Sequence, residues 1–228
     1  MSRAIIIPAA GIGKRMEANK PKQYLLLRGK PLLCYTLEIF RAYEHLVLAV
    51  EAEMQTQVQK DIVEYFNFPK TWKVITGGKQ RQDSVYEGIK ALHSSCNFVC
   101  IHDAVRPFVK PKQVEELFSV AEKTGAVVFA ARVKDTLKKA NAENQIAATV
   151  DRASLWRAQT PQVFQLSLLK KAFEDAYANN VYGTDDAMLV ERLGHVVSLF
   201  EGNDFNIKIT TPEDLDIAEL YVEYFSQK

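Results

Sequence analysis

The sequence predicts an α/β fold in which a mostly parallel β-sheet is covered by helices on both faces. Three observations support this prediction. Apolar runs such as 4–7, 98–101 and 126–131 are continuous rather than alternating, which is typical of strands buried on both sides. Segments with apolar residues at helical spacing separate these runs. The chain has 228 residues, of which 47% are hydrophobic, enough for a large packed core.

The first half of the chain alternates strands and helices. After the strand at 4–7, the pattern predicts strands at 46–50, 73–76, 98–101 and 126–131, and helices at 31–42, 55–66, 82–92 and 111–123 between them. Because a helix follows each strand, we expect the strands to run parallel and the helices to cover the sheet.

The alternation breaks between residues 133 and 150. Two β-capable segments at 136–140 and 146–150 flank a polar turn, which predicts a hairpin that projects as an arm at about 134–151. Helices at 167–179 and 184–193, a strand at 196–200 and a last helix complete the pattern. Thr211 is suited to cap that last helix and Pro212 to occupy its first position. The chain has no recognisable linker, so we expect residues 1–228 to form one domain with an arm.

Composition narrows the function classes. The chain has 29 basic and 28 acidic residues, whereas a general nucleic-acid binder usually carries a broad basic surface, so we expect no nucleic-acid partner. No apolar stretch approaches the roughly 20 residues that cross a bilayer, so we expect no membrane partner either. Three cysteines without a CxxC pair predict neither a disulfide framework nor a zinc site, and they suit a cytoplasmic location.

A glycine-containing loop with a basic flank follows the first strand. Its small residues at 8–11 let backbone N–H groups approach a ligand closely. Four cations follow within nine residues: Lys14, Arg15, Lys20 and Lys22. Such a loop is suited to a triphosphate, held by charge-assisted hydrogen bonds. The third glycine of a dinucleotide motif is Met16 here and no P-loop motif is present, which leaves a plain β-to-α turn with a solvated flank as the alternative.

Asp103 is a candidate ligand for a metal ion. It comes directly after the strand at 98–101, and ligands of open parallel sheets bind at the carboxyl ends of the strands. A carboxylate at this edge suits Mg²⁺, which prefers a few protein oxygens together with substrate phosphates. The alternatives are an ion pair with Arg106 and a turn cap.

Two other segments carry polar residues after strand-like runs. Gly78 and Ser84 follow the strand at 73–76 and lead into a helix, which indicates an anion- or base-binding edge or, alternatively, simple helix capping. Lys208 lies within a short strand-like segment at 206–210. Its side chain is expected either to extend to solvent, which is the better interpretation without further information, or to point into the site.

Taken together, these segments resemble the family of 2-C-methyl-D-erythritol 4-phosphate cytidylyltransferases, enzymes of non-mevalonate isoprenoid synthesis. The matching stretches follow the family's order along the whole chain: P-A-A-G-I-G-K-R-M (8–16), P-K-Q-Y (21–24), G-G-K-Q-R-Q-D-S-V (77–85), H-D-A-V-R-P (102–107), T-V-D-R (149–152), Q-T-P-Q-V-F (159–164), T-D-D-A (184–187) and N-I-K-I-T-T-P-E-D-L (206–215).

The resemblance implies a Rossmann-like nucleotidyltransferase fold and a homodimer in which the arm covers the partner's site. It also implies an enzyme that uses Mg²⁺ and two substrates, CTP and a polyol phosphate. The expected reaction joins CTP to 2-C-methyl-D-erythritol 4-phosphate and gives 4-diphosphocytidyl-2-C-methyl-D-erythritol and pyrophosphate.

The resemblance further implies roles for single residues. Arg15 and Lys22 are expected to stabilise the α-phosphate and the departing pyrophosphate, and Arg152 and Lys208 to hold the attacking phosphate. The residues expected to bind or position the sugar phosphate are Asp103, which also binds Mg²⁺, and Arg106, Thr136 and Thr184. Those expected to contact the nucleotide are Pro8, Ala9, Ala10, Gly11, Gly78, Ser84 and Ala104.

Two alternative functions stay open from the sequence. A sister cytidylyltransferase acts on ribitol 5-phosphate, but that family tends to begin with L-A-G-G where this chain has P-A-A-G, and residues 149–152 favour methylerythritol phosphate. The other alternative is a non-catalytic nucleotide-binding homologue. The joint presence of Arg15, Lys22, Arg152 and Lys208 argues against it.

Overall fold

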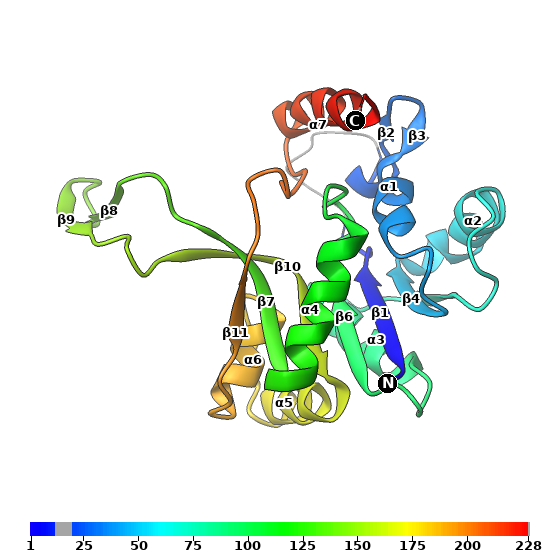
Figure 1. The fold of residues 1–228 in the computed structure, drawn as a ribbon, viewed down its shortest axis with the longest axis horizontal. Coiled ribbons are helices and arrows are strands. Elements are labelled where there is room, and N and C mark those ends of the chain that lie inside the picture. Colours follow the sequence, from blue (N-terminus) through cyan, green and yellow to red (C-terminus); the bar gives the residue numbers. More distant parts are fainter. Residues whose placement is uncertain (12–19, 228) are drawn as a thin grey trace.

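A seven-stranded β-sheet lies at the centre of the computed structural model, which describes residues 1–11 and 20–227 (Figure 1). Across this sheet the strands are, in order, β11 (Ser198–Glu201), β7 (Ala126–Arg132), β10 (Trp156–Gln165), β6 (Phe98–Ile101), β1 (Arg3–Pro8), β4 (His45–Val50) and β5 (Lys73–Thr76). Neighbouring strands pair in parallel except β10, which runs antiparallel to both β6 and β7. The predicted mostly parallel sheet is therefore confirmed.

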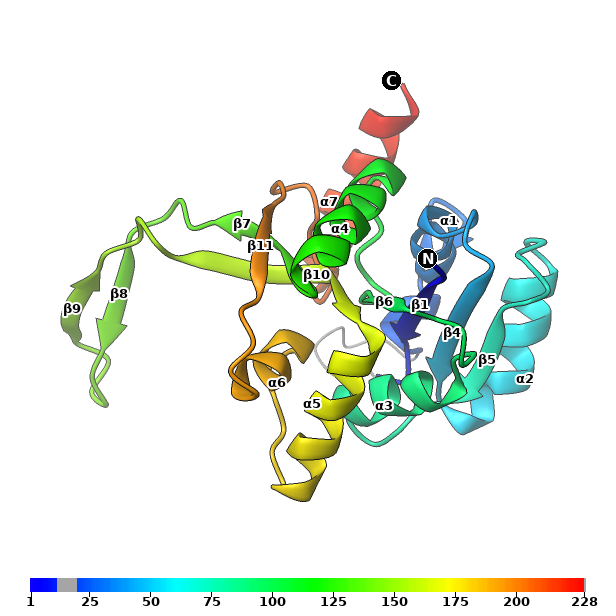
Figure 2. The same cartoon turned by 60° about the horizontal axis from the view of Figure 1, so that its bottom comes forward.

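Helices cover both faces of the sheet (Figure 2). One face carries α1 (Leu32–Ile39), α2 (Gln55–Val58) with its continuation η4 (Gln59–Glu64), and α4 (Pro111–Thr124), and the other carries α3 (Arg81–Ala91), α5 (Leu166–Ala178) and α6 (Asp186–Arg192). Strand β1 shows why its apolar run is continuous. Ile5 and Ile7 pack on the first face, whereas Ala4 and Ile6 pack on the second, and all four are fully buried.

A smaller apolar cluster lies beyond the carboxyl ends of the strands (Figure 1). Here α7 (Pro212–Ser226) packs beside the short hairpin of β2 (Leu26–Leu27) and β3 (Lys30–Pro31). The start of α7 confirms the predicted cap, because the Thr211 side chain accepts a hydrogen bond from the Asp214 N–H and Pro212 occupies the first turn. This cluster anchors two chain segments that continue into the site, one at the short helix η2 (Lys22–Tyr24) and one at Lys208.

Two sequence predictions about strands are wrong. No strand is predicted at 156–165, yet β10 runs through the middle of the sheet and shifts register between Ala158 and Gln162. Its central residues are polar but buried, and such a stretch resembles a loop in sequence. Conversely, the segment 206–210 is not a strand, and its backbone is held instead by the Ile209 N–H, which donates to the Val105 carbonyl at 3.0 Å.

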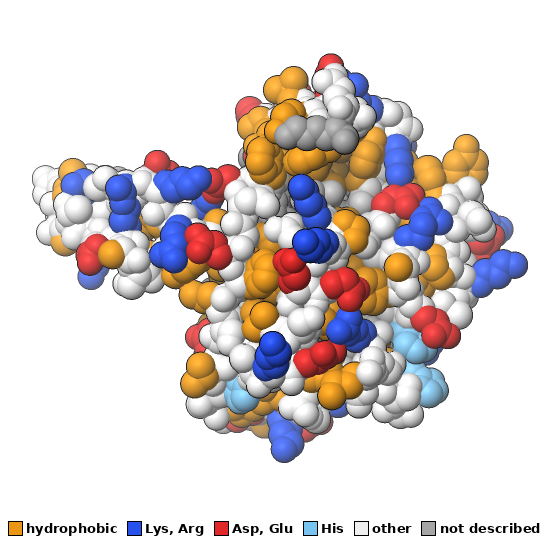
Figure 3. Space-filling model, viewed as in Figure 1, with side chains coloured by type: hydrophobic (Ala, Val, Ile, Leu, Met, Phe, Trp, Pro, Cys, Tyr) orange, Lys and Arg blue, Asp and Glu red, His pale blue; other side chains and the backbone are white. Residues whose placement is uncertain are grey.

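The predicted hairpin arm is confirmed. Strands β8 (Leu137–Ala140) and β9 (Ile146–Val150) form their own two-stranded antiparallel sheet, which extends away from the body. All residues of both strands are exposed, and Figure 3 shows charged side chains of both signs along the arm. The arm therefore buries no core of its own within this chain.

The remaining short element is η3 (Ala52–Met54), which follows β4. Cys34, Cys96 and Cys100 are buried free thiols, in keeping with the composition. Over the described part of the chain, no helix combines the length and the apolar character needed to cross a membrane.

Candidate active site

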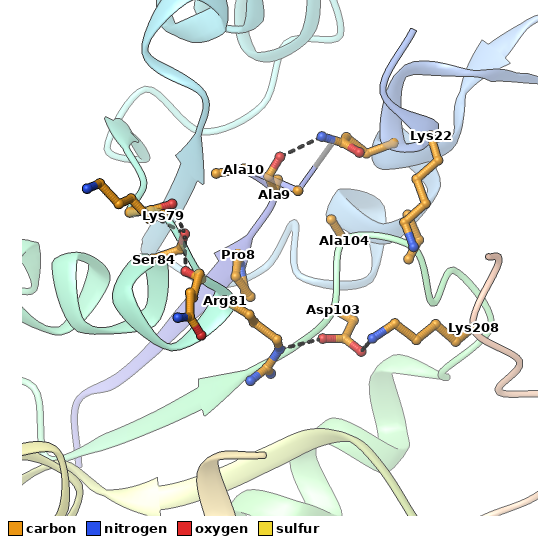
Figure 4. Close-up of a pocket in the computed structure, with 15 residues that line it drawn as sticks. Pro8, Ala9, Ala10, Lys22, Lys79, Arg81, Ser84, Asp103, Ala104 and Lys208 are labelled. Carbon is orange, nitrogen blue, oxygen red and sulfur yellow. Dashed lines mark hydrogen bonds and ion pairs between the residues drawn. The ribbon is translucent and has the colours of Figure 1, made fainter. Parts of the chain in front are cut away.

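Five of the eight matching stretches meet in one pocket at the carboxyl ends of β1, β5 and β6 (Figure 4). Its lining comes from five separate parts of the chain: Pro8, Ala9, Ala10, Gly11, Lys22, Gln23, Gly78, Lys79, Gln80, Arg81, Ser84, Asp103, Ala104, Val105 and Lys208. Every residue expected to contact a nucleotide is present, and so are Lys22, Asp103 and Lys208. Arg15 lies outside the described residues.

The loop after β1 is held close to the start of α3. Gln23, a buried side chain, donates from Nε2 to the Ala9 carbonyl at 2.6 Å and so ties the η2 segment to this loop. A Cβ on Gly77 would lie 2.7 Å from the Ala10 Cβ and 2.8 Å from the Ser84 Oγ. Glycine is therefore required at position 77, because any side chain would push the two loops apart.

Hydrogen bonds at the start of α3 show that capping and pocket lining occur together. Ser84 Oγ accepts from the Gly78 N–H at 3.1 Å and lies within 3.2 Å of the Gln80 carbonyl, to which it can donate. Asp83 Oδ2 accepts from the Gln80 N–H at 3.0 Å and completes a capping box. Asp83 is thus a structural cap, whereas Ser84 both orders the loop and lines the pocket.

Asp103 is the charged centre of the pocket. Its Oδ1 accepts from Arg81 Nε at 3.0 Å and its Oδ2 accepts from Lys208 Nζ at 2.8 Å (Figure 4). Oδ2 also accepts from Arg106 Nε at 3.4 Å. Burial alone would raise the pKa of Asp103, but the charges of Arg81, Lys208 and Arg106 outweigh it and hold that pKa well below its ordinary value. The carboxylate is therefore ionised at neutral pH. The ion pair with Arg106, given as the alternative to metal binding, exists. The interpretation favoured for Lys208, extension to solvent, is wrong, because the side chain bonds Asp103 in the pocket.

Several predicted substrate-binding residues lie off the pocket wall of this chain. Arg106 does not line the pocket but bonds Asp103, and it donates from Nη1 to the Asn206 carbonyl at 2.8 Å. Thr184 is exposed just before α6. Thr136 and Arg152 are exposed at the base of the arm, where Arg152 donates to the Lys134 carbonyl.

His102, the first residue of the H-D-A-V-R-P stretch, has a structural environment. It is fully buried, and its Nε2 lies 2.9 Å from the Arg106 carbonyl, which identifies Nε2 as the donor nitrogen. Burial lowers the pKa of His102 to about 4, so the ring is neutral at physiological pH. It supports the backbone between Asp103 and Arg106.

The pocket residues fit a magnesium ion only in part. Within residues 1–11 and 20–227, no group of three or more His, Cys, Asp or Glu side chains could hold a metal ion. Asp103 supplies one ionised carboxylate, and Mg²⁺ commonly binds through one or two carboxylates together with substrate phosphates and water. These residues therefore suit Mg²⁺ that arrives with a phosphate ligand, and three neighbouring cations oppose binding of the bare ion.

Comparison with known proteins identifies the family. The model of the 2-C-methyl-D-erythritol 4-phosphate cytidylyltransferase family matches residues 3–224. The chain belongs to this family. Relatives with the same name in Bacillus velezensis and Clostridioides difficile are 44% and 43% identical over 223 and 221 residues, which cover 96% and 95% of this chain and 95% and 92% of theirs.

Solved structures agree with the family assignment. The 2-C-methyl-D-erythritol 4-phosphate cytidylyltransferase of Thermus thermophilus superposes with a TM-score of 0.82 at 33% identity and covers 98% of this chain and 100% of its own. The 4-diphosphocytidyl-2C-methyl-D-erythritol synthase of Anaerococcus prevotii gives a TM-score of 0.85 at 30% identity, with 97% and 96% covered. The fold is thus that of an α/β nucleotidyltransferase, and the chain is a cytidylyltransferase enzyme.

Arg81 is a site residue of this cytidylyltransferase that the sequence analysis does not single out. It bonds Asp103 from Nε and donates from Nη1 to Asp186 Oδ2 at 2.8 Å. One signal was available in the sequence. Arg81 directly precedes the helix predicted at 82–92 and is the first residue of the observed α3, where a cation opposes the helix dipole and needs a compensating partner.

Proposed function

We propose that the pocket binds CTP and that the enzyme transfers its cytidylyl group to the phosphate of 2-C-methyl-D-erythritol 4-phosphate. The observation that carries this proposal is the convergence of Lys22, Asp103 and Lys208 on one pocket from three distant parts of the chain. Lys22 and Lys208 bring to the pocket the positive charge that a triphosphate needs, although the chain as a whole is nearly neutral, with a formal charge of +1.

The expected chemistry is a single in-line displacement. An oxygen of the acceptor phosphate attacks the α-phosphorus of CTP, a new P–O bond forms, and the bond to the bridging oxygen of the β-phosphate breaks so that pyrophosphate leaves. The attacking phosphate is already an anion, so no general base is required. Catalysis then rests on positioning and on neutralising charge.

The position of each lysine or arginine determines which phosphate group it is suited to neutralise. Lys22, beside the loop after β1, and Arg15 are suited to the charge on the α-phosphate and the leaving pyrophosphate. Lys208, which bonds Asp103 on the side opposite Arg81, is suited to the attacking phosphate. Asp103 is the residue that would hold Mg²⁺, which when bound supplies further positive charge to the phosphates.

The nucleotide is expected to lie on backbone rather than on long side chains. The small residues of the loop after β1 and Gly78 leave N–H and carbonyl groups accessible at the pocket wall, and Ser84 orders one of these loops. Ala104 continues the same wall after Asp103. This arrangement supports binding of a base and a ribose at close range.

We further propose that the active enzyme is a homodimer. Thr136 and Arg152 lie off the pocket of their own chain, on an arm that extends away from the body. The arm also exposes Leu137, Ile146 and Val150, apolar side chains that a second copy would cover. A mass twice that of the 25.8 kDa chain in light scattering is expected, and a monomer at micromolar concentration would contradict the proposal.

The acceptor assay tests the function directly. Purified protein is mixed with CTP, Mg²⁺ and either 2-C-methyl-D-erythritol 4-phosphate or ribitol 5-phosphate, and pyrophosphate release is followed. We expect release with the methylerythritol phosphate and much less with ribitol phosphate. Release with ribitol phosphate alone would assign the sister activity, and CTP binding without pyrophosphate would indicate a binding protein.

A further inference from the structure

Arg81 joins two buried carboxylates that belong to different parts of the fold. Its Nε bonds Asp103 Oδ1 at 3.0 Å and its Nη1 bonds Asp186 Oδ2 at 2.8 Å. The side chain of Asp103 is 9% exposed and that of Asp186 is 2% exposed. An arginine that bonds two carboxylates through different nitrogens holds both in a fixed orientation, because its guanidinium is planar and rigid.

Asp186 lies in a turn whose position is fixed by hydrogen bonds. It is the first residue of α6, and Asp185 before it caps the helix by accepting from the Met188 N–H at 3.0 Å. The buried Gln162 of β10 fixes the same turn, because its Nε2 donates to Asp185 Oδ2 at 2.9 Å and its Oε1 accepts from the Ala187 N–H at 3.1 Å. Arg81 therefore ties Asp103 to a part of the protein that is locked by hydrogen bonds.

The consequence concerns Lys208. With Oδ1 occupied by Arg81, the ammonium of Lys208 bonds only Oδ2. If Arg81 were absent, the carboxylate could turn and present both oxygens to Lys208. The lysine would then be held more tightly by Asp103 and would be less available to the attacking phosphate.

We propose that Arg81 is a positioning residue of the transfer reaction, which acts through Asp103 and Lys208 rather than by contact with CTP. The inference rests on the proposed function, because Lys208 must hold the acceptor phosphate for the effect to be seen. Arg81, held by Asp186, fixes the orientation of the Asp103 carboxylate. Only one oxygen of that carboxylate then bonds Lys208, so the ion pair between Asp103 and Lys208 stays weaker. The acceptor side of the reaction should therefore depend on Arg81 more than CTP binding does.

The double variant Arg81→Met/Asp186→Asn tests this role. Removing Arg81 alone would leave Asp186 buried without its cation, which destabilises a fold whatever the residue does in catalysis. The double variant removes one positive and one negative charge together, so the net charge of the site is unchanged. Its thermal midpoint is expected within a few degrees of the wild type.

Arg3 provides a matched control. Like Arg81 it joins two carboxylates, Glu115 at 2.6 Å and Glu122 at 2.8 Å, and its side chain is 23% exposed against 31% for Arg81. It lies at the start of β1, at the opposite end of that strand from the pocket. Arg3→Met is expected to lower the thermal midpoint while turnover stays within about twofold of wild type, since surface mutations rarely reach a remote site.

Steady-state kinetics and calorimetry separate the outcomes. For Arg81→Met/Asp186→Asn we expect kcat/KM for the acceptor to fall by about 10- to 100-fold, because a small displacement of a reacting group lowers the rate by about this factor. The dissociation constant of CTP measured without metal should change by less than about threefold. Arg81→Lys should be intermediate, because an ammonium keeps the charge but cannot reproduce the two-carboxylate geometry.

Two results would overturn the proposal. Turnover of the double variant within threefold of wild type would show that Asp103 needs no such orientation. CTP binding weakened by tenfold or more would show that Arg81 contacts the nucleotide itself. If the wild type and Arg3→Met released no pyrophosphate at all, the proposed function would be wrong, and the role of Arg81, which depends on it, would be wrong for that reason.

Discussion

The pocket and the arm contain residues expected to serve the same reaction, yet they are built in opposite ways. Asp103 is buried, bonded by three cations and placed by the end of β6 in the middle of the sheet. Arg152 and Thr136 are exposed, on a two-stranded hairpin that packs on no core within its chain. Under the proposed function, the pocket of one chain holds the nucleotide and Lys208, whereas Thr136 and Arg152 would reach the acceptor only in the site of a second chain.

This contrast has a physical basis. Parallel strands bring their carboxyl ends to one edge of the sheet, so the topology alone places residues that are distant in sequence next to each other there. A hairpin that leaves the sheet has no such constraint, and its position is determined by what it packs against. Substitutions on the two sides of that division should therefore have different consequences.

Lys22→Ala should have the largest effect. Its charge matters most when the transition state forms, so kcat is expected to fall by about 10²- to 10³-fold with a smaller change in the KM for CTP. Steady-state pyrophosphate release measures both constants. Lys112→Ala, an exposed lysine on α4, is the control and should be unaffected. A rise in KM with an unchanged kcat would contradict the role given to Lys22.

Arg152→Ala should lose activity without losing stability. Because the side chain is exposed in its own chain, the thermal midpoint should stay within about 1 °C of wild type. If the arm serves the acceptor, kcat/KM for 2-C-methyl-D-erythritol 4-phosphate should fall by about 100-fold while CTP binding is retained. Calorimetry measures whether CTP binding is retained, and the pyrophosphate assay measures kcat/KM for the acceptor. Unaltered acceptor kinetics would show that the arm serves another purpose.

Asp214→Asn should affect stability by a small amount. Asp214 Oδ2 accepts from the Thr210 N–H, the Thr210 hydroxyl and the Thr211 N–H at 2.8–3.0 Å, and so fixes the start of α7 next to Lys208. Loss of such a cap costs about 1 kcal/mol, or about 2–4 °C in Tm for a chain of this size. Asp216→Asn, an exposed acid on the same helix, should change little.

The pH dependence of this effect follows from the pKa of Asp214. Burial alone would raise that pKa, but the hydrogen bonds from Thr210 and Thr211 outweigh it and lower the pKa. A group whose pKa is lower in the folded state stabilises the fold above its unfolded pKa, and loses that stabilisation as the pH falls through the folded value. The difference in Tm between wild type and Asp214→Asn should therefore be constant from about pH 5 to 8 and narrow below about pH 4.

The smallest expected signal is the binding of Mg²⁺ without nucleotide. Arg81, Lys208 and Arg106 surround the Asp103 carboxylate, so the bare ion must displace a cation to reach it. Calorimetry should show no binding at millimolar Mg²⁺ and clear binding once CTP is present. Tight binding of Mg²⁺ alone would mean that the Asp103 cluster is a metal site in its own right.

The sequence predicts most of the sheet and much of the pocket. Strand β6 is found at its observed bounds because its residues are apolar and buried on both faces, and β5 is found at its bounds from the short β-rich run before Gly77-Gly78. Since Asp103 and Gly78 follow the ends of these strands, their meeting is a consequence of topology. The edge of the sheet at which these segments meet could therefore be predicted from the order of the strands, whereas the roles of single residues come from the family resemblance.

Tertiary contacts decide what the sequence does not reveal. Strand β10 looks like a loop because Gln159, Thr160 and Gln162 are polar, but buried partners satisfy them, as when Asn206 donates to Gln159 Oε1 at 2.9 Å. The partnership of Arg81 with Asp186 joins distant parts of the chain, and no local pattern points to it. The direction of Lys208 likewise depends on Asp103.

Subunit complementation shows whether one site is built from two chains. Arg152→Ala and Lys208→Ala proteins are each expected to be nearly inactive. If a complete site takes its pocket from one chain and its arm from another, mixing them under conditions of subunit exchange creates one intact site per mixed dimer. Pyrophosphate release should then recover to about a quarter of the wild-type rate at equal mixing. No recovery, with exchange verified by mass, would show that Arg152 and Lys208 act within one chain.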